Sequence, residues 1–128
     1  MTDPAELANV RYLVDDVEAA VAFYTEVLDF EVITSFPPIF ADVLLGNLRL
    51  LLAGPSSSAG QPMDDGTKPG PGGWNRIHLI VDDIDAEIAR LRDGGAQFRN
   101  DVIAGPAGKQ VLLVDPSGNF VELFEYAR

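Results

Sequence analysis

The residues best able to do chemistry are few, and three of them fall on two predicted strands. His78 is the only histidine in the chain and stands two residues after Arg76. Because side chains alternate along a strand, Arg76 and His78 share one face. Glu122, in the last predicted strand, is the carboxylate we expect to pair with Arg76, since a guanidinium and a carboxylate fit as a fork. Glu122 therefore has three interpretations: a structural ion pair, a ligand contact, or a metal ligand.

The other polar candidates are Asn9 and Arg11 in the first predicted strand. Arg11 is either a charge at the rim of the protein or a clamp for an anionic or carbonyl-bearing ligand. One interpretation of His78 is a hydrogen-bonded histidine of the pocket or core. The other is a ligand contact or a general base, because an imidazole titrates near neutral pH. Alternation places Asn9 and Arg11 on one face of their strand.

Composition excludes several classes of protein. The chain has 128 residues, no cysteine and one histidine, so it has no thiol nucleophile, no disulfide framework and no two-histidine metal site within one chain. A net charge of -11 disfavours nucleic acid and anionic membranes as partners. The N-terminus has no basic and apolar leader pattern, and no apolar run is long enough to span a membrane. We therefore expect a cytoplasmic protein.

An internal repeat organises the chain. The segment NVRYLVDDVEAAVAFY, which begins at Asn9, aligns with RIHLIVDDIDAEIARL, which begins at Arg76, and five of the sixteen positions are identical. Each copy predicts a strand, then a pair of aspartates that cap a helix with one apolar stripe. A chance match with the same hydrophobic phasing over this length is improbable, so the chain is predicted to contain two related modules.

Short β-rich runs follow each predicted helix and complete the two modules as βαβββ. The runs are residues 30–36, 40–45 and 48–53 in the first module, and 97–103, 110–114 and 120–126 in the second. A segment rich in proline and glycine, residues 54–73, joins the modules. It is either a flexible connector or a flap over a pocket. Trp74 follows it directly and either plugs the core or stacks on a ligand.

The paired βαβββ units, the VDD helix starts, the FYxxVLxFE run after the first helix and the DPSGNxVEL run near the end together resemble the vicinal oxygen chelate superfamily. This group comprises glyoxalases, bleomycin-resistance proteins and extradiol dioxygenases. The resemblance implies an α+β fold in which two modules curl into a cup-shaped mixed sheet with helices on the convex face. It also implies a homodimer. We predict one domain over residues 1–128, with module one at about 8–53 and module two at about 74–126.

Metal-dependent members of this group hold a divalent ion at four positions, which fall here on Asn9, Leu50, Arg76 and Glu122. Only Glu122 is a normal ligand. Leu50 has no ligand atom, and the permanent charge of Arg76 would repel a metal. We therefore predict no metal and no other cofactor.

The predicted pocket has an apolar, aromatic wall and a polar cluster, which is the usual chemistry of a small-molecule site. On the last strand Phe120 and Phe124 share the face of Glu122. On the fourth strand Leu48, Leu50 and Leu52 are expected to join them. The ligand-binding candidates are Asn9, Arg11, Leu50, Trp74, Arg76, His78, Phe120, Glu122 and Phe124.

This pocket predicts a metal-free small-molecule-binding protein. The resemblance to bleomycin-resistance proteins implies that it gives antibiotic resistance by sequestering an aromatic drug or natural product in the cups of a dimer. The acidic surface favours a cationic or neutral ligand. The alternatives are a glyoxalase-like lyase, isomerase or dioxygenase. Such an enzyme would be metal-dependent through Glu122, or metal-free with His78 as the base.

Overall fold

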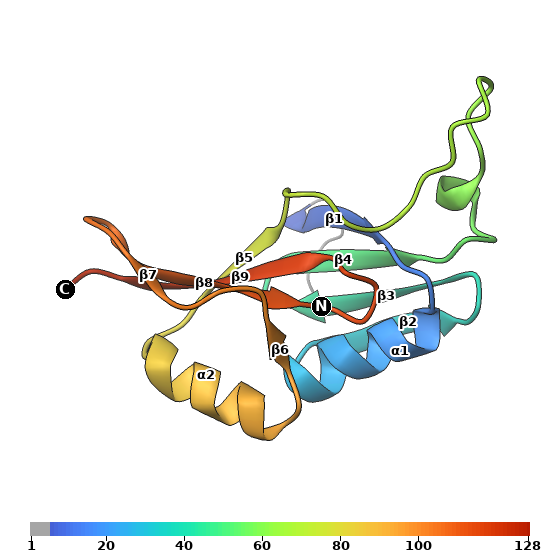
Figure 1. Cartoon of the computed structure of the whole chain (residues 1–128). Helices are drawn as coiled ribbons and strands as arrows, with labels where there is room; N and C mark the ends of the chain where they lie inside the picture. Colours follow the sequence, from blue (N-terminus) through green and yellow to red (C-terminus); the bar gives the residue numbers. More distant parts are fainter. Residues whose placement is uncertain (1–5) are drawn as a thin grey trace. The chain divides into compact units, whose positions relative to one another are not determined.

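The computed structural model describes residues 6–128, drawn in Figure 1. Residues 1–5, which carry most of the N-terminal segment considered above, lie outside the described part. The chain forms two compact units, one ending at Gly72 and the other running from Gly73 to Arg128. None of the helices within residues 6–128 is long and apolar enough to cross a membrane.

The first unit is a four-stranded sheet in the order β1-β4-β3-β2, with β1 and β4 parallel and the other neighbours antiparallel. Asp16 caps its helix, as the aspartate pair predicts, by accepting a hydrogen bond of 3.1 Å from the backbone N–H of Ala19. The last turn of the helix widens into a π-helix, and Asp29 ends the turn with a positive φ of 64°. The elements are β1 (Ala8–Leu13), α1 (Val17–Ala22), η2 (Phe23–Val27), β2 (Glu31–Phe36), β3 (Phe40–Leu45) and β4 (Leu48–Ala53).

The second unit repeats this plan with the sheet order β5-β9-β8-β6, and a short β7 also pairs with β8. The predicted strand over 97–103 is interrupted. Asn100 interrupts it because its side-chain oxygen accepts the backbone N–H of Leu112 at 2.9 Å, replacing a ladder bond. The elements are β5 (Ile77–Ile80), α2 (Ile84–Asp93), β6 (Gln97–Phe98), β7 (Ile103–Ala104), β8 (Gly108–Val114) and β9 (Phe120–Tyr126).

Each unit buries one face of its sheet against its helix, as the alternating apolar pattern predicts. Figure 1 shows α1 along one side of the first sheet. Tyr24 is fully buried there, and in the second unit Ile84 and Leu91 have the same role. We call the other side of each sheet its open face. The large apolar strand residues that are fully buried in the two units are Val43, Leu50, Leu52, Val111, Leu113, Val121 and Leu123.

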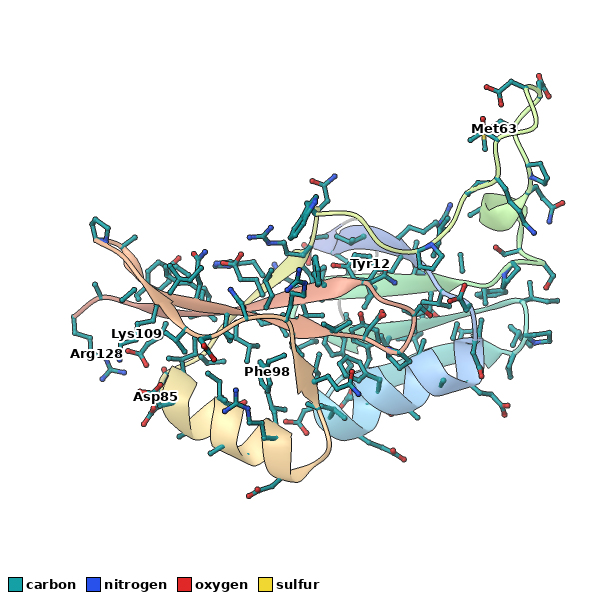
Figure 2. The ribbon with its side chains drawn as sticks, viewed as in Figure 1. Tyr12, Met63, Asp85, Phe98, Lys109 and Arg128 are labelled. Atoms are coloured by element: carbon teal, nitrogen blue, oxygen red, sulfur yellow. The ribbon has the colours of Figure 1, made fainter. Side chains whose placement is uncertain are left out.

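The segment after β4 begins as an ordered part of the first unit. Ser57 is buried, and its Oγ donates to the carbonyl of Gly54 at 2.6 Å and accepts from the N–H of Gly60 at 3.2 Å. These bonds fix the short 3-10 helix η3 (Ser58–Gly60). A turn then follows around Met63, whose N–H donates to the Thr67 carbonyl at 2.7 Å, and Figure 2 shows Met63 near the far end of this segment.

Candidate functional site

A carboxylate that contacts two basic side chains lies on the open face of the second unit. Strand pairing sets His78 opposite Glu122. Arg76 donates through Nε to Glu122 Oε1 at 3.0 Å, and its Nη2 lies 2.9 Å from the same oxygen. His78 Nε2 lies 3.2 Å from Oε2. Both oxygens of Glu122 are therefore occupied, and the ion pair expected between Arg76 and Glu122 is present.

Burial divides the roles of these three groups. The side chain of Glu122 is 10% exposed, whereas the side chains of Arg76 and His78 are 29% and 43% exposed. A buried carboxylate needs a partner because its charge has lost most of its hydration. Arg76 and His78 supply that partner and still reach solvent, so a molecule on this face would meet the two basic groups before the acid.

Aromatic rings flank this cluster along β9. Trp74 packs against Phe120 with ring centroids 5.2 Å apart, and His78 packs against Phe124 at 5.0 Å. Tyr126 meets Phe124 edge to face at 5.2 Å. Trp74 is 66% exposed, so it does not plug the core, and one side of its indole is available for stacking. We call Trp74, Phe120, Phe124 and Tyr126 the aromatic platform.

The open face of the first unit carries a different polar cluster. Arg49 donates through Nε to Asp42 Oδ2 at 2.7 Å, and its Nη1 reaches Asn9 Oδ1 at 3.4 Å. Asp42 is 1% exposed, and its Oδ1 has no hydrogen-bond partner in the described part of the chain. Asn9 was predicted from the sequence, whereas Asp42 and Arg49 were not. The usable signal was a charged residue inside each of the otherwise apolar runs FADVLL and LRLLLA.

A cavity of about 480 Å³ opens beside this cluster, and Arg11 lies in its wall. Within residues 6–128 the structure gives Arg11 no hydrogen-bond or ion-pair partner. Ser57, Ser58 and Ala59 form part of the wall, so the start of the linking segment lines a cavity. The full lining is Arg11, Ile39, Phe40, Ala41, Arg49, Leu51, Leu52, Ala53, Ser57, Ser58 and Ala59.

Leu50 is not on an open face, and this prediction was wrong. Leu50 is fully buried in the helix-covered face, and so is Leu52. The prediction aligned the Gly-Asn turn before β4 with the one before β9, which matched Leu50 with Glu122. The pairing of β1 with β4 and of β5 with β9 shows that the residue equivalent to Glu122 is one position later in the chain. Arg11 is paired with Leu51, as His78 is paired with Glu122. Leu51 is therefore the counterpart of Glu122, and it lines the cavity.

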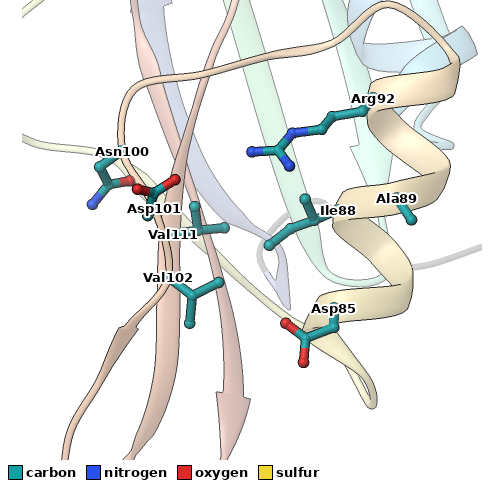
Figure 3. A pocket seen from close by; sticks show the side chains of 8 residues that line it. All are labelled: Asp85, Ile88, Ala89, Arg92, Asn100, Asp101, Val102 and Val111. Atoms are coloured by element: carbon teal, nitrogen blue, oxygen red, sulfur yellow. The ribbon is translucent and has the colours of Figure 1, made fainter.

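A smaller cavity of about 250 Å³ lies on the helix side of the second unit, between α2 and the segment 100–102. Figure 3 shows Ile88 and Arg92 facing Asp101 and Val102 across it. Its volume is below the range of roughly 300–1,000 Å³ typical of small-molecule sites. None of the predicted site residues lines this cavity.

Comparison with known proteins places the chain among related folds. The family model described as the Glyoxalase/Bleomycin resistance protein/Dioxygenase superfamily matches residues 6–123. No curated protein matches the chain. Lactoylglutathione lyase from Agrobacterium tumefaciens is 25% identical, with a TM-score of 0.75 over 97% of this chain and 96% of that one.

Two further solved structures are similar over nearly the whole chain. A superfamily member from Sphaerobacter thermophilus DSM 20745 is 28% identical, with a TM-score of 0.74 over 93% of this chain and 95% of that one. TnmS3, an antibiotic binding protein from Streptomyces sp. CB03234, is 25% identical, with a TM-score of 0.72 over 94% and 95%. With its α+β fold and the family match over residues 6–123, this chain belongs to the glyoxalase/bleomycin resistance protein/dioxygenase superfamily.

Proposed function

We propose that the protein is a metal-free small-molecule-binding protein that sequesters an aromatic drug or natural product. The observation that carries this proposal is the aromatic platform, with Trp74 exposed at its end and the ion pair of Arg76 and Glu122 at its centre. Exposed rings beside a few polar groups give a ligand apolar contact and a fixed orientation. The proposal includes the homodimer that the resemblance implies.

The comparisons support a binding function without separating it from catalysis. One similar structure is an antibiotic binding protein and another is a lactoylglutathione lyase, both at 25% identity. The choice between them therefore rests on the side chains of this chain. The arrangement around Glu122 favours binding, because both of its oxygens already contact Arg76 or His78.

The side chains present do not fit the divalent metal used by other members of the superfamily. Glu122 is the only normal ligand at the four family positions, and both of its oxygens contact Arg76 or His78. A metal at this carboxylate would sit beside the permanent charge of Arg76. In the first unit the register puts Leu51 at the position that corresponds to Glu122. Within residues 6–128, no three histidine or acidic side chains gather as a metal site would require.

The intrinsic fluorescence of the protein gives a direct test. Trp74 is the only tryptophan, so all tryptophan emission reports on the aromatic platform. Titration with a panel of neutral and cationic polycyclic aromatic compounds is expected to quench this emission saturably for at least one member. Replacing Phe120 with Ala should weaken the binding of that compound about tenfold, because Phe120 supports the indole.

A matched variant separates a ligand contact from general damage to the fold. Phe98 lies on the other side of the second sheet, where the Arg92 guanidinium lies 5.2 Å from its ring centroid. Phe98→Leu should leave the binding constant unchanged. Absence of saturable quenching across the whole panel would contradict the proposed function, and equal losses in both variants would contradict the role of the platform.

A second candidate function is proton transfer by His78, and the contact between its Nε2 and Glu122 favours it. A carboxylate that contacts one imidazole nitrogen orients the ring. The other nitrogen, Nδ1, could then take a proton from a carbon next to a carbonyl group.

This candidate is tested by deuterium exchange in heavy water. Lactoylglutathione has a hydrogen on the carbon beside its thioester carbonyl, and NMR follows the loss of that signal in the presence of chelator-treated protein. If His78 is a base, the wild type accelerates exchange, and the exchange rate with His78→Ala is at least about a hundredfold lower than with the wild type. Exchange no faster than in buffer contradicts this candidate and leaves the binding function in place.

A further inference from the structure

We propose that the cavity of the first unit binds the carboxylate of a monoanionic ligand and that Arg11 is its anchor. This inference rests on the proposed binding function and adds to it a second class of ligand, an acid bound in the cavity of the first unit. It runs against the net charge of the chain, which by itself favours cationic or neutral compounds. The local arrangement around Arg11 is the reason.

The internal repeat supplies the first observation. Arg11 and His78 occupy equivalent positions 67 residues apart. In the second unit the residue opposite His78 on the neighbouring strand is the carboxylate of Glu122, at 3.2 Å. In the first unit the residue opposite Arg11 is Leu51. The same register therefore provides a counter-charge for the basic residue in one unit and an apolar side chain in the other.

The charges around the cavity supply the second observation. Arg49 also lines the cavity, but Asp42 holds its Nε at 2.7 Å and neutralises it. Arg11 has no such partner within residues 6–128. In the described part of the chain, the lining therefore carries one positive charge without an ion-pair partner, that of Arg11. A guanidinium prefers a carboxylate because two parallel N–H groups match its two oxygens.

The other residues that line the cavity indicate the chemistry of the rest of the ligand. Ile39 and Phe40 are 47% and 39% exposed although they are apolar, and together with Leu51 they offer a surface for a hydrocarbon or aromatic body. The hydroxyl of Ser58 adds a polar group on the linking segment. A volume of about 480 Å³ lies inside the roughly 300–1,000 Å³ range of small-molecule sites. The chemistry fits a compact aromatic monocarboxylate.

The test compares an acid with its neutral isostere. Isothermal titration calorimetry is performed on the full chain with naphthalene-1-acetate and with naphthalene-1-acetamide, which has the same rings without the charge. We expect the wild type to bind the acid at least about tenfold more tightly than the amide. In Arg11→Met, which keeps the aliphatic stem, the affinity for the acid should fall to the affinity for the amide. The affinity for the amide should be unchanged.

Two variants with the same change in net charge serve as controls. Arg99→Met removes an exposed arginine of the second unit and should keep the preference for the acid. Leu51→Glu places a carboxylate opposite Arg11, as Glu122 stands opposite His78, and should abolish the preference without removing Arg11.

The outcomes separate this inference from the function on which it rests. Equal binding of acid and amide by the wild type, or a preference that survives in Arg11→Met, overturns the anchor and leaves the binding function in place. Loss of the preference in Arg99→Met also overturns it, since the effect would then come from net charge. Absence of binding by every aromatic compound, charged or neutral, would contradict the binding function itself.

Discussion

Replacing Leu50 with alanine is expected to lower the free energy of unfolding by about 3 kcal/mol, because a fully buried leucine leaves a cavity in the core. The adjacent Leu51→Ala is expected to lower it by no more than about 1 kcal/mol. Leu50 is 0% exposed on the helix-covered face, whereas Leu51 is only partly buried and lines the open-face cavity. The pair therefore tests the strand register directly.

Urea denaturation followed by circular dichroism measures both variants on the same scale. The removed groups are identical, so the two leucines are matched in size and differ only in the face that they occupy. A larger loss for Leu51→Ala than for Leu50→Ala would show that the sheet has the opposite face toward the helix. In that case Leu51 could not be the counterpart of Glu122.

Replacing Arg76 with leucine is expected to destabilise the protein by about 2 kcal/mol. The change leaves Glu122, which is 7% exposed, with the His78 imidazole as its remaining contact within residues 6–128, and a buried charge that loses its partner is costly. The double variant Arg76→Leu/Glu122→Leu removes both charges and should return to within about 1 kcal/mol of the wild type.

Arg90 provides the matched control for this prediction. It pairs with Glu87 at 2.9 Å on the exposed side of α2, and such surface pairs contribute little, so Arg90→Leu should cost less than about 0.5 kcal/mol. Thermal and urea unfolding give these differences. If the double variant were as unstable as Arg76→Leu, the loss would come from the packing of the arginine stem and not from the stranded carboxylate.

The repeat made much of each unit predictable, because the same alternation and the same aspartate caps occur twice. Asp16 and Asp83 cap their helices in the same way, at 3.1 Å in both. The face of β4 that carries Leu50 was predicted wrongly for a local reason. Gly-Asn directly precedes both β4 and β9, but the parallel pairing differs by one residue between the units, with Arg11 opposite Leu51 and His78 opposite Glu122.

The candidate site was partly predictable. Alternation placed Arg76 and His78 on one face, and the structure brings both to Glu122. The pairing of Asp42 with Arg49 was missed although the two-residue turn Gly46-Asn47 fixes the register between β3 and β4. In that register Asp42 and Arg49 lie diagonally on one face. The exposure of Trp74 was also open, because a tryptophan after a loop packs inside or outside according to the strand it meets.

The bonds around Ser57 divide the linking segment into a fixed part and a tip. The fixed part walls a cavity, whereas the tip is a separate turn in which Thr67 donates its N–H to Asp65 at 2.9 Å and lowers the pKa of that carboxyl. Gly66 has open space around it, and exposed tips of this kind tolerate inserted sequence. A reporter peptide or a label added at the tip would therefore leave the cavity wall in place.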